Sequence, residues 1–260
     1  MIMRFPNDSI CNLQIIMDDL IISLLAEKLN AFIAQGLPDL NNCFLRVKYA
    51  YPGISQEKSA LLLNLHPFQR QIELKRIVGG ILNGHYDNQE INGWIVHKWG
   101  CTRFNVNDQN RINNFVEHLN EGQVITDLEF FRISSLSKIV SFVSRENYFV
   151  FDSRVAYSLD GLLLEIQRER PELQVSFFPL PSARGNRSVE MRNRIQRIYP
   201  GADFFPYSRA YMEYNDLIPR LREQIEWAQD VPAFGVEMLL FVLGRTGGKI
   251  EERMKAFDEA

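Results

Sequence analysis

Cysteine is scarce in this chain of 260 residues. The sequence holds three cysteines, Cys11, Cys43 and Cys101, an odd number at wide separations. This spacing offers neither the close cysteine pairs of a zinc site nor the framework of a small disulfide-rich domain. We therefore expect a protein of a reducing compartment, the cytoplasm.

Long apolar runs are also missing, although hydrophobic residues make up 46% of the chain and charged residues 23%. No stretch approaches the roughly 20 apolar residues of a membrane helix. Near the N-terminus, Asp8, Asp18 and Asp19 interrupt the apolar run that a signal peptide needs. The composition is that of a globular protein, and we expect it to have no membrane partner.

Several catalytic and cofactor motifs are absent. The four histidines, His66, His85, His97 and His118, form no H-x3-H or HExxH pair, so the sequence predicts no protein metal site. No serine lies in a G-x-S-x-G elbow, and no strand is followed by G-x-G-x-x-G. The glycine-rich turn at 244–248 lacks the Walker spacing. We expect neither a metal nor an organic cofactor.

A strongly basic charge balance is missing as well. The formal net charge of −3 argues against a protein that coats nucleic acid through bulk charge. Residues 132–210 nevertheless hold twelve Lys and Arg against eight Asp and Glu, a balance of +4 that leaves −7 for the rest of the chain. Within 182–197, five arginines surround one acid: Arg184, Arg187, Arg192, Arg194 and Arg197. Guanidinium groups on a glycine-containing loop suit phosphate binding, and the structural alternative is a solvated loop and helix face.

Helical periodicity is the main pattern that is present. Apolar residues recur at spacings of three and four, and Ser55 and Asp152 are placed as helix N-caps. Gly79 and Gly80 interrupt one such helix and predict close packing or a kink. Residues 44–52 alternate enough for a short strand. The prediction is a mainly α fold with a minor β segment.

Proline and arginine concentrate between residues 165 and 206, which indicates a weak domain seam. On this basis the chain divides into a helical domain at 1–165 and an arginine-rich loop with further helices at 166–260. A chain of this length can form two small domains or one large one. The two parts can therefore also pack as a single domain.

The stretch from residue 127 to 159 carries the most specific pattern. A first helix is followed by a serine-rich turn, whose hydroxyl groups compete for backbone hydrogen bonds. Ser137 suits the N-cap of a helix over 138–144, and Asp152 suits the N-cap of the next helix. The seven-residue connector between them, when extended, can bring the two helix N-termini side by side. Lys138 and Asp152 would then lie close together at the entrance of one site.

This stretch resembles the core of the helix-hairpin-helix base-excision DNA glycosylases, most nearly the oxidised-guanine branch. That family places a lysine just after its hairpin and an aspartate at the head of the next helix, as with Lys138 in SLSKIVSF and Asp152 in FVFDSRVA. Serines stand where the family hairpin carries glycines. The resemblance covers roughly residues 90–165 and implies a multi-helix glycosylase fold.

The resemblance also implies roles for individual residues, with duplex DNA as the partner. Lys138 would be the amine nucleophile that forms a Schiff base with the sugar, and Asp152 the carboxylate that steadies positive charge and moves protons. The DNA-binding candidates are hydroxyl and guanidinium side chains, namely Ser134, Ser135, Ser137, Arg154, Arg184, Arg187 and Arg192. Trp94, Trp99 and Phe104 are candidates to stack a flipped base, and the alternative for the two tryptophans is a core anchor.

Two other functions fit the sequence. A DNA-binding or sensing subunit of the same fold without catalysis would keep the arginine surface and tolerate the loss of Lys138. A protein-interaction role would scatter Arg184, Arg187 and Arg192 over different faces. Aspartate before serine at a helix start is also a common cap, worth about 1 kcal/mol without any catalysis.

Overall fold

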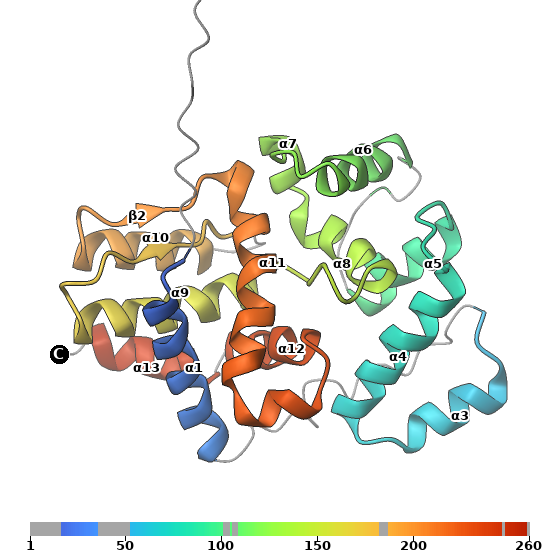
Figure 1. Ribbon diagram of the computed structural model, residues 1–260, viewed down its shortest axis with the longest axis horizontal. Coiled ribbons are helices and arrows are strands. Elements are labelled where there is room, and N and C mark those ends of the chain that lie inside the picture. The colour runs from blue at the N-terminus through green and yellow to red at the C-terminus, as the bar shows by residue number, and fades with distance from the viewer. Residues whose placement is uncertain are drawn as a thin grey trace, which may run out of the picture.

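The computed structural model describes residues 17–35, 53–100, 105, 109–181, 187–245 and 248–258. These residues are mainly helical, which confirms the predicted fold class (Figure 1). The helices of the first half are α1 (Asp19–Ala34), α3 (Gln56–Asn64), α4 (Pro67–Leu82), α5 (Gln89–Gly93), the π-helix η1 (Trp94–Trp99), α6 (Gln109–Asn120), α7 (Asp127–Phe130) and α8 (Ile133–Val143). Those of the second half are α9 (Ser153–Glu169), α10 (Arg187–Ile198), α11 (Tyr207–Gln224), the 3-10 helix η2 (Glu226–Asp230), α12 (Phe234–Leu243) and α13 (Lys249–Asp258). No helix in the described ranges is long and apolar enough to cross a membrane.

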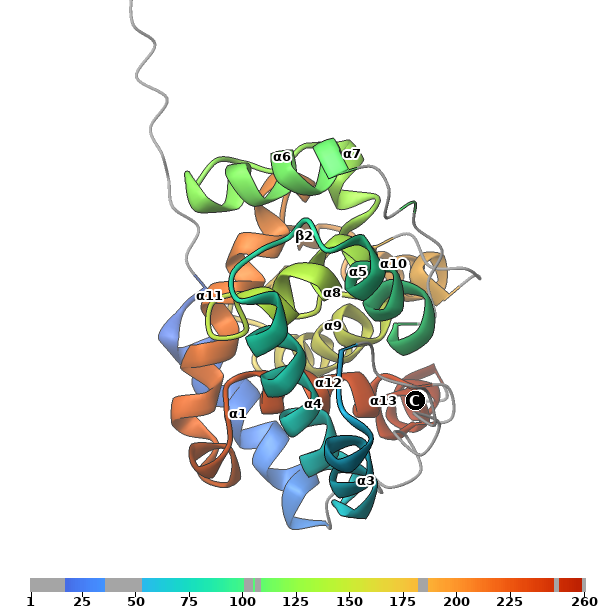
Figure 2. The same ribbon diagram turned by 90° about the vertical axis from the view of Figure 1, so that its right-hand side faces the viewer.

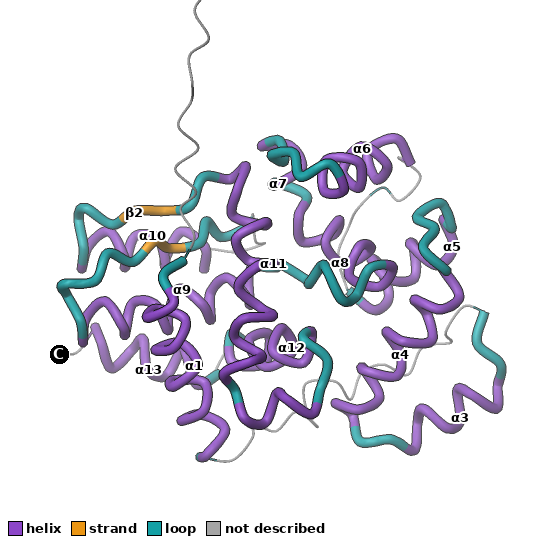
Figure 3. The backbone as a smooth tube through the Cα atoms, in the orientation of Figure 1, coloured by secondary structure: helices purple, strands orange, loops and turns teal. Residues whose placement is uncertain are grey.

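One small parallel sheet lies among the described residues (Figure 3). Strands β1 (Ser176–Phe177) and β2 (Asp203–Phe204) pair residue for residue, Ser176 with Asp203 and Phe177 with Phe204. The strand expected at 44–52 falls outside the described residues. The minor β segment that the structure shows is therefore a different one.

Local signals account for several helix starts. Ser55 accepts a hydrogen bond from the backbone N–H of Lys58 at 3.3 Å, and Asp152 caps α9 in the same way, which confirms both predicted N-caps. Thr126 and Glu129 form a capping box at the start of α7. Each cap satisfies N–H groups that the first turn of a helix leaves without partners.

Two clusters of buried apolar side chains hold the helices together. The larger one is built mainly on α1, α9, α11 and α12, and the smaller one lies between α3, α4, α5, η1 and α8. Figure 2 shows α8 and α9 in the middle of the molecule, with α6 and α7 at one end and α3 at the other. The boundary expected at 165 falls within α9, and the larger cluster contains residues from both sides of it.

Gly79 brings α4 against α8. A Cβ atom at this position would collide with the backbone carbonyl oxygen of Phe142, whereas a Cβ at the neighbouring Gly80 would meet nothing within 4 Å. The close packing predicted from the glycine pair is therefore confirmed at Gly79. This contact places α8, which carries Lys138, directly on α4.

Candidate active site

Lys138 and Asp152 lie together at the junction of α8 and α9. Lys138 is in the second turn of α8, and Asp152 immediately precedes the first residue of α9. The Lys138 Nζ is 3.8 Å from Oδ2 of Asp152, and it also donates to the carbonyl oxygen of Ser134. The Asp152 side chain is 13% exposed and that of Lys138 only 4%, so the pair opens to solvent on the carboxylate side.

The two oxygens of Asp152 have different tasks. Oδ1 accepts hydrogen bonds from the backbone N–H groups of Arg154 at 2.9 Å and Val155 at 3.2 Å. This N-cap fixes the carboxylate at the positive end of α9, where a negative charge is favoured. Oδ2 remains for the amine of Lys138. The Asp152 side chain therefore caps α9 with one oxygen and faces Lys138 with the other.

Gly100 makes room for the lysine. It follows the π-helix η1, and a Cβ at this position would lie 2.5 Å from Cδ and 2.9 Å from Cε of Lys138. Any side chain here would displace the lysine stem. Single π-turns in helices occur often at functional sites. Gly100 is thus a site residue that the sequence does not indicate, because a lone glycine after a tryptophan carries no distinctive signal.

Burial lowers the pKa of the Lys138 amine below its ordinary value, because the charged form loses its hydration. The negative charges of Asp152 and Glu237 oppose this effect, and the positive charges of Arg154 and Lys75 add to it. The balance is a lowered pKa. A larger fraction of the amine is therefore neutral, and hence nucleophilic, than for a lysine in water.

A second, fully buried ion pair lies behind this site. The Lys75 Nζ of α4 is 2.9 Å from Oε2 of Glu237 in α12, and it lies 5.8 Å from the ring centroid of Trp99 and 4.9 Å from that of Phe234. The same Glu237 oxygen accepts the backbone N–H of Val150 at 3.0 Å. Burial raises the pKa of Glu237, and the charge of Lys75 opposes the rise. The only sequence signal for the pair is two charged residues within apolar stripes.

Helix α11 fixes the connector that leads to Asp152. Tyr211 donates its hydroxyl to the carbonyl oxygen of Phe149, and Tyr214 donates to that of Val150, both at 3.0 Å. Asn215 accepts the backbone N–H of Phe149 at 2.9 Å. Tyr211 and Tyr214 lie three residues apart, a spacing typical of a packing stripe. They also satisfy backbone groups of a segment without regular structure, a need that only the tertiary arrangement creates.

The serine-rich turn predicted at residues 133–137 is wrong, because α8 already begins at Ile133 and contains all three candidate serines. Ser135 and Ser137 are buried, and Ser134 is half-buried. Ser137 is not an N-cap: its Oγ accepts the backbone N–H of Phe151 at 3.0 Å. A continuous apolar stripe packs this helix against the core and overrides the local preference of serine for turns.

The two described aromatic candidates, Trp94 and Trp99, pack in or against the smaller core cluster. Trp94 is 6% exposed in the smaller core cluster, edge-on to Phe142, which is the core-anchor alternative. Trp99 is half-buried and donates its indole N–H to Gln71 at 2.8 Å. Phe104 lies outside the described residues. Trp99 still reaches the site indirectly, through its contact with Lys75.

The arginine candidates lie in different parts of the structure. Arg154 is exposed in the first turn of α9, next to Asp152, with its guanidinium 4.7 Å from the ring centroid of Phe241. Arg192 lies on α10 in the wall of a separate pocket. Arg184 is outside the described residues, and Arg187 begins α10 with a side chain that is also outside them. Arg154 is therefore the arginine that the structure brings to the lysine and aspartate.

The site offers an amine and a carboxylate. Among the residues that the structure describes, no group of three or more His, Cys, Asp or Glu side chains could hold a metal ion. No family model, curated protein or solved structure matches the chain. Its function is therefore inferred from Lys138, Asp152 and their surroundings.

Proposed function

We propose that this chain is a DNA N-glycosylase with AP lyase activity, on a helix-hairpin-helix glycosylase fold. One observation carries the proposal: the buried amine of Lys138, with a lowered pKa, lies 3.8 Å from a carboxylate oxygen of Asp152. A neutral amine beside a carboxylate is the pair that nucleophilic attack and proton transfer at one carbon require. The resemblance of the surrounding sequence supplies the substrate class.

In this mechanism the neutral Nζ of Lys138 attacks C1′ of a deoxyribose. The bond from C1′ to the base breaks, and its electron pair leaves with the base, which takes a proton from solvent. Asp152 Oδ2 stabilises the positive charge that develops on the sugar and then accepts a proton from the new ammonium nitrogen. The C1′–O4′ bond then opens, O4′ takes up the proton that Asp152 accepted, and an iminium ion forms at C1′. Asp152 removes a proton from C2′, and the 3′ phosphate leaves with the electron pair of the C3′–O3′ bond, which cleaves the strand.

The reacting base has to leave the duplex before this chemistry can occur. Lys138 is 3% exposed, so the surface over its stem has to open as the sugar arrives. Asp152 lies at the open side of the pair, and Arg154 is exposed next to it. We assign Arg154 to a phosphate beside the flipped nucleotide, because its planar guanidinium suits that anion.

A non-catalytic DNA-binding subunit of the same fold is the second candidate. The low exposure of Lys138 is the observation that favours it, because a structural lysine would be buried in the same way. The two candidates differ in one outcome. Only the glycosylase forms a covalent bond between Lys138 and DNA.

Borohydride trapping tests the proposal on duplexes that carry oxidised, deaminated, alkylated or abasic sites. The expected result is a reduced covalent adduct with at least one of these duplexes, which Lys138→Gln abolishes. Lys98→Gln is the matched control, because Lys98 is an exposed lysine of η1 and its loss removes the same charge. An adduct that survives in Lys138→Gln, or no adduct with any duplex, would contradict the lysine mechanism.

A further inference from the structure

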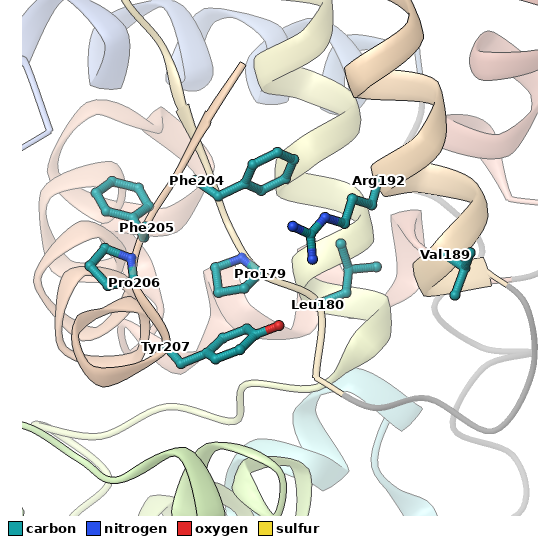
Figure 4. A pocket seen from close by; sticks show the side chains of 8 residues that line it. All are labelled: Pro179, Leu180, Val189, Arg192, Phe204, Phe205, Pro206 and Tyr207. Atoms are coloured by element: carbon teal, nitrogen blue, oxygen red, sulfur yellow. The ribbon is translucent and has the colours of Figure 1, made fainter. Parts of the chain in front are cut away.

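A pocket of about 380 Å³ lies away from Lys138, between the segment after β1, helix α10 and the junction of β2 with α11. Its lining is apolar except for two polar tips, and it consists of Pro179, Leu180, Val189, Arg192, Phe204, Phe205, Pro206 and Tyr207 (Figure 4). The guanidinium of Arg192 and the hydroxyl of Tyr207 reach into it from different sides. An apolar wall with a few polar groups, in this range of volume, is typical of a small-molecule site.

The paired strands β1 and β2 hold one wall of the pocket in place. The backbone N–H of Phe205 donates to the carbonyl oxygen of Phe177 at 2.9 Å and so extends the pairing of β1 with β2. Phe178 packs its ring against that of Phe205 at 4.9 Å and donates its N–H to the buried carboxyl group of Asp160 at 2.8 Å. Pro179 follows directly and restricts the backbone further. The wall of the pocket on the β1–β2 side is therefore preformed, which lowers the cost of binding.

Arg192 is exposed, and its guanidinium carbon is 5.4 Å from the ring centroid of Phe204. It forms no ion pair with any carboxylate in the described part of the chain, in contrast to Arg209, Arg220 and Arg253. An arginine in cation–π contact with an aromatic ring can keep its N–H groups available for an anion. The pocket thus presents a flat cationic surface that is ready for an anion.

These features fit a planar ring that carries a phosphate. A flat ligand can lie between Tyr207 and the Arg192–Phe204 pair, with its anionic group on the guanidinium. We propose that the pocket binds an unstacked nucleobase of single-stranded DNA, with the adjoining phosphate on Arg192. The inference rests on the proposed function, since that function identifies DNA as the partner.

The position of the pocket supports a strand path from the α7–α8 junction. Tyr207 stacks on Phe130 with ring centroids 4.8 Å apart, and it contacts Phe131 at 5.9 Å. Phe131 is 51% exposed, and Leu128 of α7 is 79% exposed. Tyr207 therefore connects the exposed Phe131, in the turn before α8, with the lining of the pocket. Exposed aromatic platforms beside a basic group are the usual means of binding unpaired bases.

Fluorescence anisotropy with a short labelled oligothymidylate tests the inference. An oligomer of equal length made of tetrahydrofuran abasic sites is the matched ligand, because it has the same phosphates, no bases and no aldehyde that could react with Lys138. We expect the oligothymidylate to bind about tenfold more tightly than the abasic oligomer. Arg192→Gln should weaken the binding of the oligothymidylate about tenfold. Arg197→Gln is the matched control on the exposed side of the same helix, away from the pocket, and should weaken it by less than about twofold.

Equal binding of the two oligomers, or equal effects of Arg192→Gln and Arg197→Gln, would overturn the inference, because bulk charge would then explain the affinity. Binding of a phosphotyrosine peptide without any binding of the oligothymidylate would overturn it too. Borohydride trapping separates this failure from that of the proposed function. An adduct without a specific effect of Arg192→Gln would support the glycosylase function and contradict nucleobase binding in the pocket. A specific effect of Arg192→Gln without any adduct would support nucleobase binding in the pocket and contradict the glycosylase function.

Discussion

At Asp152, one carboxylate serves both a structural and a chemical purpose. Oδ1 caps α9, which alone explains why an aspartate precedes a helix here. Oδ2 lies 3.8 Å from Lys138 Nζ, which a simple cap does not require. The two purposes can be separated by substitution because asparagine caps a helix about as well as aspartate does.

We predict that Asp152→Asn keeps the stability and loses the chemistry. The amide oxygen can still accept the N–H groups of Arg154 and Val155. Burial already lowers the pKa of Lys138, so its amine can release a proton instead of remaining an unpaired buried charge, and the free energy of unfolding should change by less than about 1 kcal/mol. The negative charge is gone, so base release should slow by about 100-fold or more. Urea unfolding and a base-release assay measure the two effects. A variant that releases base at the wild-type rate would show that Asp152 is only a cap.

Asp160 predicts a pH dependence of stability. Its carboxyl group is fully buried in α9, and burial raises its pKa well above the usual value despite the N–H of Phe178. A raised folded-state pKa gives a contribution to stability that is fully present below the unfolded pKa of about 3.9. That contribution is lost as the pH rises through the folded-state pKa. The free energy of unfolding should therefore decrease with pH over this window.

Asp160→Asn should remove that dependence. Asparagine keeps an oxygen for the Phe178 N–H and avoids the buried negative charge. We expect the variant and the wild type to be closest in free energy of unfolding at acid pH. As the pH rises, the variant should become increasingly more stable than the wild type. Urea unfolding over a pH series measures the difference. A difference that does not change with pH would contradict the assignment.

At the scale of elements, the contact of α4 with α8 depends on a single glycine. Gly79→Ala should destabilise the protein by about 1–3 kcal/mol, because the new methyl group would meet the backbone carbonyl of Phe142, which cannot move aside as a side chain can. Gly80→Ala, one residue further and exposed in the same helix, is the matched control. It should stabilise the protein by about 0.5–1 kcal/mol through helix propensity alone. Thermal or urea unfolding that shows the same sign for both variants would contradict the packing.

The helical pattern and two N-caps could be predicted from the sequence because they depend on neighbours a few residues away. Ser55 and Asp152 are correct for this reason. The turn predicted before Ser137 is wrong because Ser135 and Ser137 are buried within α8. The Ser137 hydroxyl accepts the backbone N–H of Phe151, which lies fourteen residues away. Local preference cannot anticipate a partner that tertiary folding supplies.

The candidate site divides in the same way. A short sequence pattern predicts that Lys138 and Asp152 lie close together, and the structure places them side by side. Gly100 and the Lys75–Glu237 pair were not found, because each depends on contacts between distant helices. A charged residue inside an apolar stripe is the signal that could have indicated the pair.

At the scale of the whole molecule, the Lys75–Glu237 ion pair connects the two parts of the fold. Lys75 belongs to α4, on the smaller core cluster, and Glu237 to α12, in the larger one. Glu237 also holds the N–H of Val150, two residues before Asp152. The pair therefore fixes the site from behind while it joins the two core clusters.

Removal of one partner should destabilise the protein strongly, because the other charge stays buried. We expect Glu237→Gln to cost about 3–5 kcal/mol, although glutamine can still accept the Val150 N–H. The double variant Lys75→Met/Glu237→Gln should recover at least half of this loss, since no buried charge remains. A double-mutant cycle by urea unfolding measures the coupling. Additive losses would show that the two residues do not act as a pair.

The most direct test of the proposed function is the location of the covalent bond. A duplex with an abasic site is incubated with the full chain and borohydride, and the digested product is mapped by tandem mass spectrometry. We predict that the reduced sugar adduct lies on Lys138, the amine beside Asp152. An adduct that lies on Lys98 or on scattered exposed lysines would contradict the mechanism, and so would a protein that remains unmodified.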